Sequence, residues 1–191
     1  MGDGVYLVGV GSFEQHGPHL PFETDTLIAE AVALRVAEKT GGELGTTIGV
    51  GLSEEHMDFP GTKTLALDEF EQQIMVVVNA HPKAIFINGH GGNNRALRDL
   101  GVRHVNLTSM FKPYDHAGEI ETSIIMHLRS DLVSSGKICK HEFRWPDKDG
   151  WRMKDYSITG VLGDPTAATA DKGRAYLDEL VEKTVELISR L

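Results

Sequence analysis

Residues 14–25 read EQHGPHLPFETD and bring together carboxylates and imidazoles, the side chains that bind metal ions. Glu14 and His16 are two positions apart, so in an extended chain their side chains face the same side. Asp25 follows after a turn that contains glycine and proline. Oxygen and imidazole ligands together suit a divalent ion such as zinc, manganese or iron. The alternative is that Asp25 caps a helix and that the histidines are ordinary loop residues.

A glycine-rich segment, NGHGGNN at residues 88–94, offers another imidazole. Glycines around a single histidine allow tight backbone turns and the close approach of a ligand, so His90 is a further candidate ligand. A phosphate-binding loop is the weaker interpretation, because Asn94 stands where the dinucleotide-binding pattern needs its third glycine. The other alternative is a turn that contains an incidental histidine.

Two further polar segments carry histidines and acids. HAGEIETS at residues 116–123 begins with His116 and contains Glu119 and Glu121. Glu119 shares a helical face with His116 if the helix is regular, whereas acidic residues in a first turn are also ordinary partners of the helix dipole. Which glutamate faces a site stays open at this point. SEEHMDFPGT at residues 53–62 places Glu55 and His56 where they would shape the rim of a site.

Strand and helix patterns alternate along the chain. Short apolar runs predict strands, and apolar spacing of three to four predicts helices. The predicted strands cover 5–10, 47–52, 84–87 and 104–109, and the predicted helices cover 26–39, 68–80, 94–101, 118–132 and 169–190. This alternation predicts an α/β domain over residues 1–191, with a mostly parallel sheet covered on both faces. Residues 133–160 lack a sustained period and are predicted to be an insertion or a hairpin.

The order of the elements predicts where a site lies. Ligands of open parallel sheets bind outside the carboxyl ends of the strands. The four histidine-bearing segments each follow one of the four predicted strands, so they are expected to converge at one rim. This joint placement is stronger evidence than any single motif.

Composition narrows the partners and the compartment. The 191 residues are 40% apolar and carry a formal net charge of −9, which argues against nucleic acid or an anionic membrane as partner. No apolar segment approaches the roughly 20 residues that cross a bilayer. The chain has a single cysteine, which excludes an intrachain disulfide and fits a reducing compartment. A cytoplasmic protein is expected.

The quoted segments, together with GVLGDPTAAT near the carboxyl end, resemble in order the blocks of the creatininase (creatinine amidohydrolase) family. The resemblance runs from about residue 5 to residue 185. It implies a three-layer α/β/α fold and hydrolysis of a C–N amide bond at a centre of two divalent ions, zinc, manganese or iron. It also implies a homo-oligomer, often a hexamer.

Carried over motif by motif, the resemblance implies that Glu14 and His90 hold one ion, that His16 holds the other and that Asp25 bridges both. Creatinine amidohydrolase itself has a glutamate ligand where this chain has Gly92, so Glu121 or water would have to complete the second ion. Two residues are predicted to be catalytic, and four to contact substrate. The predicted proton shuttles are His116 and Glu121, and the predicted substrate contacts are Asn93, Glu119, Glu55 and His56.

The predicted function is hydrolysis of a small-molecule amide by metal-activated water. Branches of the family that carry NGHGGN resemble this chain more than creatinine amidohydrolase does. The specific substrate predicted is therefore a formamide intermediate of flavin or deazaflavin biosynthesis. Creatinine and a peptide-derived cofactor precursor are the alternative substrates. A scaffold that binds metal or ligand without turnover is the alternative from another class of protein.

Overall fold

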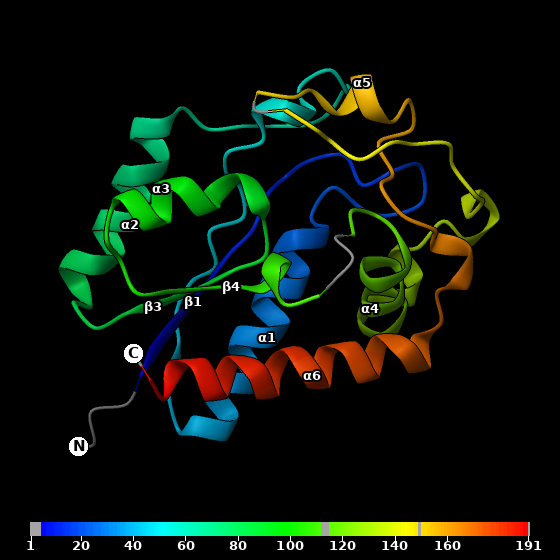
Figure 1. Cartoon of the computed structure of the whole chain (residues 1–191). Helices are drawn as coiled ribbons and strands as arrows, with labels where there is room; N and C mark the ends of the chain where they lie inside the picture. The colour runs from blue at the N-terminus through cyan, green and yellow to red at the C-terminus, as the bar shows by residue number, and fades with distance from the viewer. Residues whose placement is uncertain (1–4, 112–114, 149, 191) are drawn as a thin grey trace.

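The computed structural model describes residues 5–111, 115–148 and 150–190. Its centre is a sheet of parallel strands in the order β2-β1-β3-β4 (Figure 1). The strands are β1 (Tyr6–Val10), β2 (Glu43–Leu44), β3 (Ile85–Asn88) and β4 (His104–Asn106). Within these ranges no helix is long and apolar enough to cross a membrane.

Helices cover both faces of the sheet. They are α1 (Thr24–Thr40), α2 (Leu67–Ala80), α3 (Asn94–Asp99), α4 (Glu119–Arg129), α5 (Met153–Tyr156) and α6 (Ala170–Ile188). One core joins Leu7 of β1 to α1, α4 and α6, and a second joins Val8 and Val10 to α2 and α3. Neighbouring β1 residues thus enter opposite cores, as the period of two in a strand requires. The predicted three-layer α/β/α fold with a parallel sheet is confirmed.

The second strand differs from its prediction. The paired residues are Glu43–Leu44, whereas in the predicted range 47–52 only Ile48 forms a bridge, to Val10. The chain leaves the ladder after Ile48 because Gly51 lies against Asn93, where a Cβ would come within 2.4 Å of the Asn93 side-chain oxygen. Residues 52–56, which follow, lie beside the ends of β1 and β3, where Leu52 O contacts His90 and His56 contacts Glu14.

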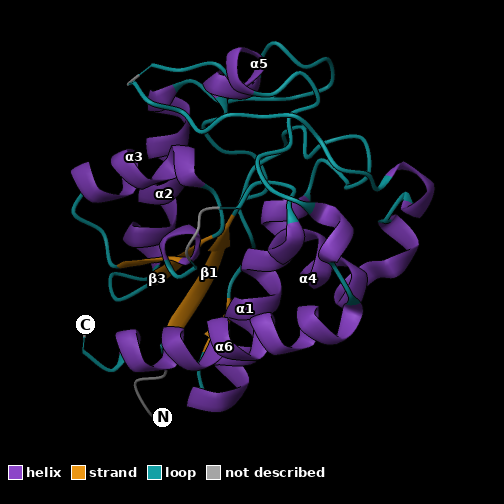
Figure 2. Cartoon of the chain, turned by 45° about the vertical axis from the view of Figure 1, so that its right-hand side comes forward, coloured by secondary structure: helices purple, strands orange, loops and turns teal. Residues whose placement is uncertain are grey.

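The segment 133–160 is not a hairpin in its described part. It contains one short 3₁₀ turn, Ser135–Lys137, and α5, but no strand ladder among residues 133–148 and 150–160. In Figure 2 the arrow of strand β1 points toward the loops that lie next to α5. The segment therefore lies near the carboxyl ends of the strands, where the site is expected.

Candidate metal centre

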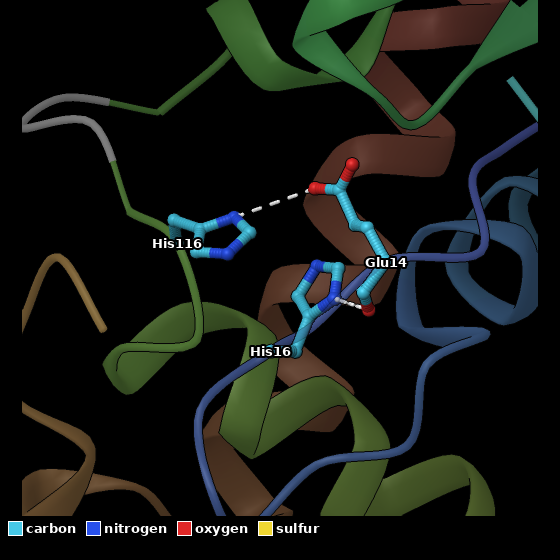
Figure 3. A group of neighbouring side chains, drawn as sticks. All are labelled: Glu14, His16 and His116. Carbon is cyan, nitrogen blue, oxygen red and sulfur yellow. Dashed lines mark hydrogen bonds and ion pairs between the residues drawn. The ribbon is translucent and has the colours of Figure 1, made fainter. Parts of the chain in front are cut away.

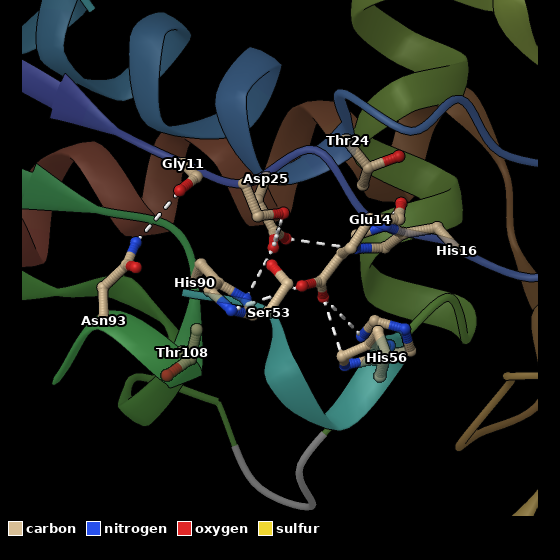
Figure 4. Close-up of polar contacts among 12 residues, drawn as sticks. Gly11, Glu14, His16, Thr24, Asp25, Ser53, His56, His90, Asn93 and Thr108 are labelled. Carbon is tan, nitrogen blue, oxygen red and sulfur yellow. Dashed lines mark hydrogen bonds and ion pairs between the residues drawn. The ribbon is translucent and has the colours of Figure 1, made fainter. Parts of the chain in front are cut away.

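Asp25 lies at the middle of a buried cluster at the carboxyl ends of the strands. It comes from the first turn of α1, yet its carboxylate does not cap that helix. Its Oδ2 accepts a 2.8 Å hydrogen bond from Ser12 and lies 3.0 Å from Nδ1 of His90. Its Oδ1 lies 3.1 Å from Nε2 of His16. The carboxylate therefore faces two imidazoles from two different strand ends (Figure 4).

Both imidazoles have the anchoring that metal-binding histidines usually show. Nδ1 of His16 lies 3.0 Å from the backbone oxygen of Glu14, and Nε2 of His90 lies 2.9 Å from that of Leu52. A ring nitrogen that donates to a carbonyl fixes the tautomer and leaves the other nitrogen for a metal. The nitrogens left over are the two that face Asp25.

Glu14 is completely buried, and neither carboxylate oxygen has a hydrogen-bond partner. His90 Nε2 lies 3.2 Å from one oxygen and His56 Nε2 lies 3.3 Å from the other, but neither contact has hydrogen-bond geometry. A buried carboxylate without hydrogen-bond partners is costly unless a cation compensates it. The side chain thus fits a metal ion better than it fits a structural role.

Glu121 is the glutamate of α4 that faces the cluster. Its Oε2 accepts a 2.6 Å bond from the backbone N–H of Ala117 and lies 3.7 Å from Nε2 of His16. Ala117 is buried and has a φ of 54°, a left-handed conformation that costs energy for a residue with a Cβ. This turn sets where α4 starts and so directs Glu121 inward.

The donor atoms form three overlapping sets, each with ligand atoms within 4.8 Å of one another: Glu14, Asp25 and His90; His16, Asp25 and Glu121; and Glu14, His16 and His116. Asp25 belongs to the first two sets, which is the arrangement of a carboxylate that bridges two cations. Figure 3 shows the third set, with His116 beside Glu14 and His16. His116 therefore lies beside one member of each of the other two sets, Glu14 of the first and His16 of the second.

The pKa values show how strongly the carboxylates and imidazoles of the cluster act on one another. Burial raises the pKa of Glu14 to about 7, against the opposing effect of His90. Burial lowers the pKa of His16, but Asp25, Glu121 and Glu14 outweigh it and raise that pKa to about 10. His90 likewise reaches about 10, because Glu14 and Asp25 outweigh burial. Protons on these two imidazoles thus supply the positive charge that a divalent ion would replace.

Two other histidines in the cluster are neutral. Burial, with the nearby positive histidines, holds the pKa of His56 and of His116 well below the usual range. The amide nitrogen of Gln15 lies 2.9 Å from Nδ1 of His56, and Nε2 of His116 lies 3.1 Å from the backbone oxygen of Gln15. Because an amide nitrogen only donates, we assign the proton of His56 to Nε2, which faces Glu14.

The predicted substrate contacts divide into two groups. Asn93 is completely buried, and its amide is already used: it donates to Gly11 O and accepts from Leu52 N–H (Figure 4). Glu119 pairs with Tyr176 and Lys172 of α6. Asn93 thus ties loops together and Glu119 joins two helices, and contact of either residue with substrate stays a prediction.

Glu55 and His56 lie closer to the expected place. Glu55 is half-buried and lines a groove next to Gly92. His56 is 2% exposed and contacts Glu14, so it lies deeper than the rim position predicted for it. This depth could not be predicted locally, because Trp151, which is distant in sequence, lies with its ring 6.2 Å from that of His56.

Gln15 and Ser12 belong to the site and were not predicted. Gln15 lies between two candidate ligands in sequence and contacts both His56 and His116, while Ser12 bonds Asp25. The only sequence signal was their position beside Glu14, directly after an apolar strand.

The comparisons with known proteins agree with this geometry. The profile of the family Creatininase, described as creatinine amidohydrolase, matches residues 1–188. The chain belongs to the creatininase family. Members of this family are amidohydrolases, so the chain is an enzyme that acts on carbon–nitrogen bonds.

Three curated relatives show the range of substrates within this similarity. A mycofactocin precursor peptide peptidase from Mycobacterium ulcerans (strain Agy99) is 34% identical, covering 96% of this chain and 84% of the relative. A 2-amino-5-formylamino-6-ribosylaminopyrimidin-4(3H)-one 5′-monophosphate deformylase from Methanothermobacter marburgensis is 28% identical, with coverages of 94% and 78%. Creatinine amidohydrolase from Pseudomonas putida is 25% identical, with coverages of 98% and 89%.

Solved creatininase structures share the fold, and the names of two of them include zinc or manganese. A manganese creatininase superposes with a TM-score of 0.81 at 25% identity, covering 99% of this chain and 91% of that chain. A creatininase mutant of the Zn-Zn type superposes with a TM-score of 0.80 at 25% identity, with coverages of 98% and 90%. The candidate ligand sets described above therefore occur in a fold that binds zinc or manganese elsewhere in the family.

Proposed function

We propose that this protein is a two-metal hydrolase that cleaves a peptide bond in a precursor peptide. The observation that carries the hydrolytic centre is Asp25, a buried carboxylate shared between two sets of metal-ligand atoms. Support for a peptide comes from the relatives, since the peptide peptidase at 34% identity is more similar than the deformylase at 28% or the creatininase at 25%. The formamide substrate predicted from the sequence is the second candidate, supported by the deformylase.

Five residues would hold the two ions. Glu14, His90 and Asp25 would bind the first, and His16, Glu121 and Asp25 the second. Glu121 thus takes the role that a glutamate at the position of Gly92 has in creatinine amidohydrolase. Such ions, when bound, lower the pKa of water from about 15.7 to roughly 7 and polarise a carbonyl oxygen.

His116 is the residue we place in proton transfer. Burial and the nearby His16 hold the pKa of His116 well below its usual range, so the imidazole is neutral and, as a weak base, readily passes on a proton that it takes up. Its Nδ1 lies 3.9 Å from Glu14, and its Nε2 is held by Gln15 O. Hydrolysis adds oxygen to the carbonyl carbon and breaks the C–N bond, and the leaving nitrogen must gain a proton. His116 passes that proton from the attacking water to the nitrogen, a role worth about 10²–10⁴ in rate.

The test is metal analysis followed by a panel of substrates: a peptide library, formamides and creatinine. We expect about two zinc or manganese ions per chain and release of an amine from peptides. Asp25→Ala is expected to lose both metal and turnover while its circular dichroism spectrum is unchanged. Glu119→Gln is the matched control, because that carboxylate pairs with Lys172 and Tyr176.

Three results would oppose the proposal. An active Asp25→Ala protein would refute the metal centre. Turnover of formamides alone would favour the deformylase. Metal at full occupancy without turnover of any amide would favour a binding scaffold.

A further inference from the structure

Gln15 is a buried amide that lies among the candidate metal ligands without being one of them. It is 5% exposed, and its amide nitrogen lies 2.9 Å from Nδ1 of His56 and 3.3 Å from Nε2 of His116. A buried amide either ties loops together, as Asn93 does, or decides which nitrogens of a neighbouring imidazole carry hydrogen. The contacts of Gln15 distinguish these two roles.

Two backbone groups fix the orientation of the Gln15 amide. The N–H of Gly17 donates to Oε1 at 3.0 Å, and Nε2 donates to the carbonyl oxygen of Gly160 at 3.2 Å. A backbone N–H only donates and a carbonyl oxygen only accepts, so the oxygen and the nitrogen of this amide cannot be exchanged. Gly160 has a φ of 78°, and a Cβ there would overlap Oε1 of Gln15. Position 160 therefore has to be glycine where this amide lies.

The amide side chain determines the tautomer of His56. The amide nitrogen has two hydrogens, and the Gly160 oxygen accepts one of them. The other goes to Nδ1 of His56, the shorter of the two imidazole contacts. Because Nδ1 accepts, the hydrogen of the His56 ring is on Nε2, which lies 3.3 Å from Oε1 of Glu14 (Figure 4).

The backbone of the same residue determines the tautomer of His116. Nε2 of His116 lies 3.1 Å from the backbone oxygen of Gln15, which only accepts, so this nitrogen carries the hydrogen of the ring. Nδ1 then keeps its lone pair and lies 3.9 Å from Oε1 of Glu14. Two backbone hydrogen bonds to Leu162, of 3.0 and 2.9 Å, hold His116 in this place.

The two imidazoles therefore face one oxygen of Glu14 with opposite hydrogen-bonding character. We propose that Gln15 is a positioning residue that keeps His56 a hydrogen-bond donor at Nε2 and His116 a base at Nδ1. When the oxygen of water attacks the carbonyl carbon, His116 takes the proton of that water and His56 donates to the carbonyl oxygen that becomes negative. This inference rests on the proposed hydrolysis and deepens it, since it assigns the donor and acceptor atoms.

Neutron diffraction from deuterium-exchanged crystals grown with zinc tests the assignment without any turnover. We expect deuterium on Nε2 of both His56 and His116 and none on either Nδ1. Gln15→Met replaces the amide by a side chain of similar length that donates no hydrogen bond. In this variant deuterium on His56 should spread to Nδ1, while His116 should stay as in wild type because the backbone oxygen remains.

Two diffraction results would overturn the inference. One is deuterium on Nδ1 of either ring in the wild type, which would mean that the hydrogen bonds run in another direction. The other is a His56 ring that is the same in Gln15→Met and in the wild type, which would mean that the amide does not set its tautomer.

Peptide kinetics test the consequence for the reaction. Gln15→Met should lower kcat about 10–100-fold, the usual cost of losing a group that orients an active-site side chain, with KM and metal content unchanged. Gln72→Met makes the same exchange at an exposed position of α2 and should keep the wild-type kcat. Equal kcat in Gln15→Met and wild type would overturn the inference. Loss of metal from Gln15→Met would also overturn it, because Gln15 would then only support the ligands Glu14 and His16.

Failure of this inference is distinguishable from failure of the proposed function. The expected deuterium positions in a protein that cleaves no peptide would support the positioning of both rings and refute the proposed reaction alone. Cleavage of peptides by a protein with deuterium on Nδ1 of His56 would refute the role of Gln15 alone.

Discussion

Glu14 gives the sharpest prediction, because a ligand built for a cation should destabilise the protein when the cation is removed. Burial raises its pKa from 4.5 to about 7, and the side chain is completely buried. This rise corresponds to about 3 kcal/mol of lost folding stability at pH 8, where the carboxylate is charged in both states. Glu14→Gln removes the charge, so the metal-free variant should be more stable than wild type by up to about 3 kcal/mol at pH 8.

The size of this stability difference depends on pH. Below pH 4.5 the carboxyl group is protonated in folded and unfolded chains, and the two proteins should be equally stable. The difference grows as pH rises through the range from 4.5 to about 7, and it should be below about 1 kcal/mol at pH 5.

The assay is urea denaturation of chelator-treated protein at pH 5 and pH 8, with and without zinc. Zinc at a hundred times its Kd should stabilise wild type by about 2.7 kcal/mol and stabilise the variant much less. Glu119→Gln is the control and should show neither effect. If Glu14→Gln is less stable than wild type at pH 8 without metal, or if zinc stabilises both equally, the reasoning is wrong.

Two other predictions follow from the same cluster, and a third concerns buried His19, whose Nε2 lies 2.9 Å from Oγ1 of Thr122. Glu121→Gln keeps an oxygen for the Ala117 N–H and should reduce bound metal from about two ions to one; unchanged metal content would remove Glu121 from the ligands. His116→Gln should lower kcat by about 10²–10⁴ with metal content unchanged, whereas loss of metal would make His116 a ligand. Burial, with nearby His141, lowers the pKa of His19 from 6.5 to about 4, so the free energy of unfolding should fall as pH falls from 6.5 to 4. His19 should contribute up to about 1.4 kcal/mol per pH unit to the slope, so the slope should be smaller by about that amount in His19→Gln, while an equal slope in both proteins would contradict it.

Local patterns in the sequence were sufficient to predict the layers of the fold. The buried β1 run and the helical spacing of α1 and α6 depend on periodicity, which is a property of the sequence itself. The predicted bounds of the second strand were wrong. Residues 47–52 are as apolar as a strand, but Gly51 packs against Asn93 and Leu52 N–H donates to Asn93, so this stretch leaves the sheet. No local pattern contains such a tertiary contact.

The site shows the same division. Glu14, His16, Asp25 and His90 lie together as the motif order predicted, because parallel strands end at one rim. Which of Glu119 and Glu121 faces the cluster depends on the left-handed turn at Ala117, which no local pattern predicts. The sequence likewise does not show whether Asn93 faces a ligand or, as observed, the backbone of Gly11. The homo-oligomer stays a prediction, which light scattering can test.

The central claim is that two cations share Asp25, and anomalous scattering from crystals grown with zinc tests it most directly. We predict two peaks about 3.5–4 Å apart. One should lie between Glu14 and His90, the other between His16 and Glu121, with Asp25 contacting both. A single peak away from Asp25, or no peak among these side chains at saturating zinc, would contradict the account.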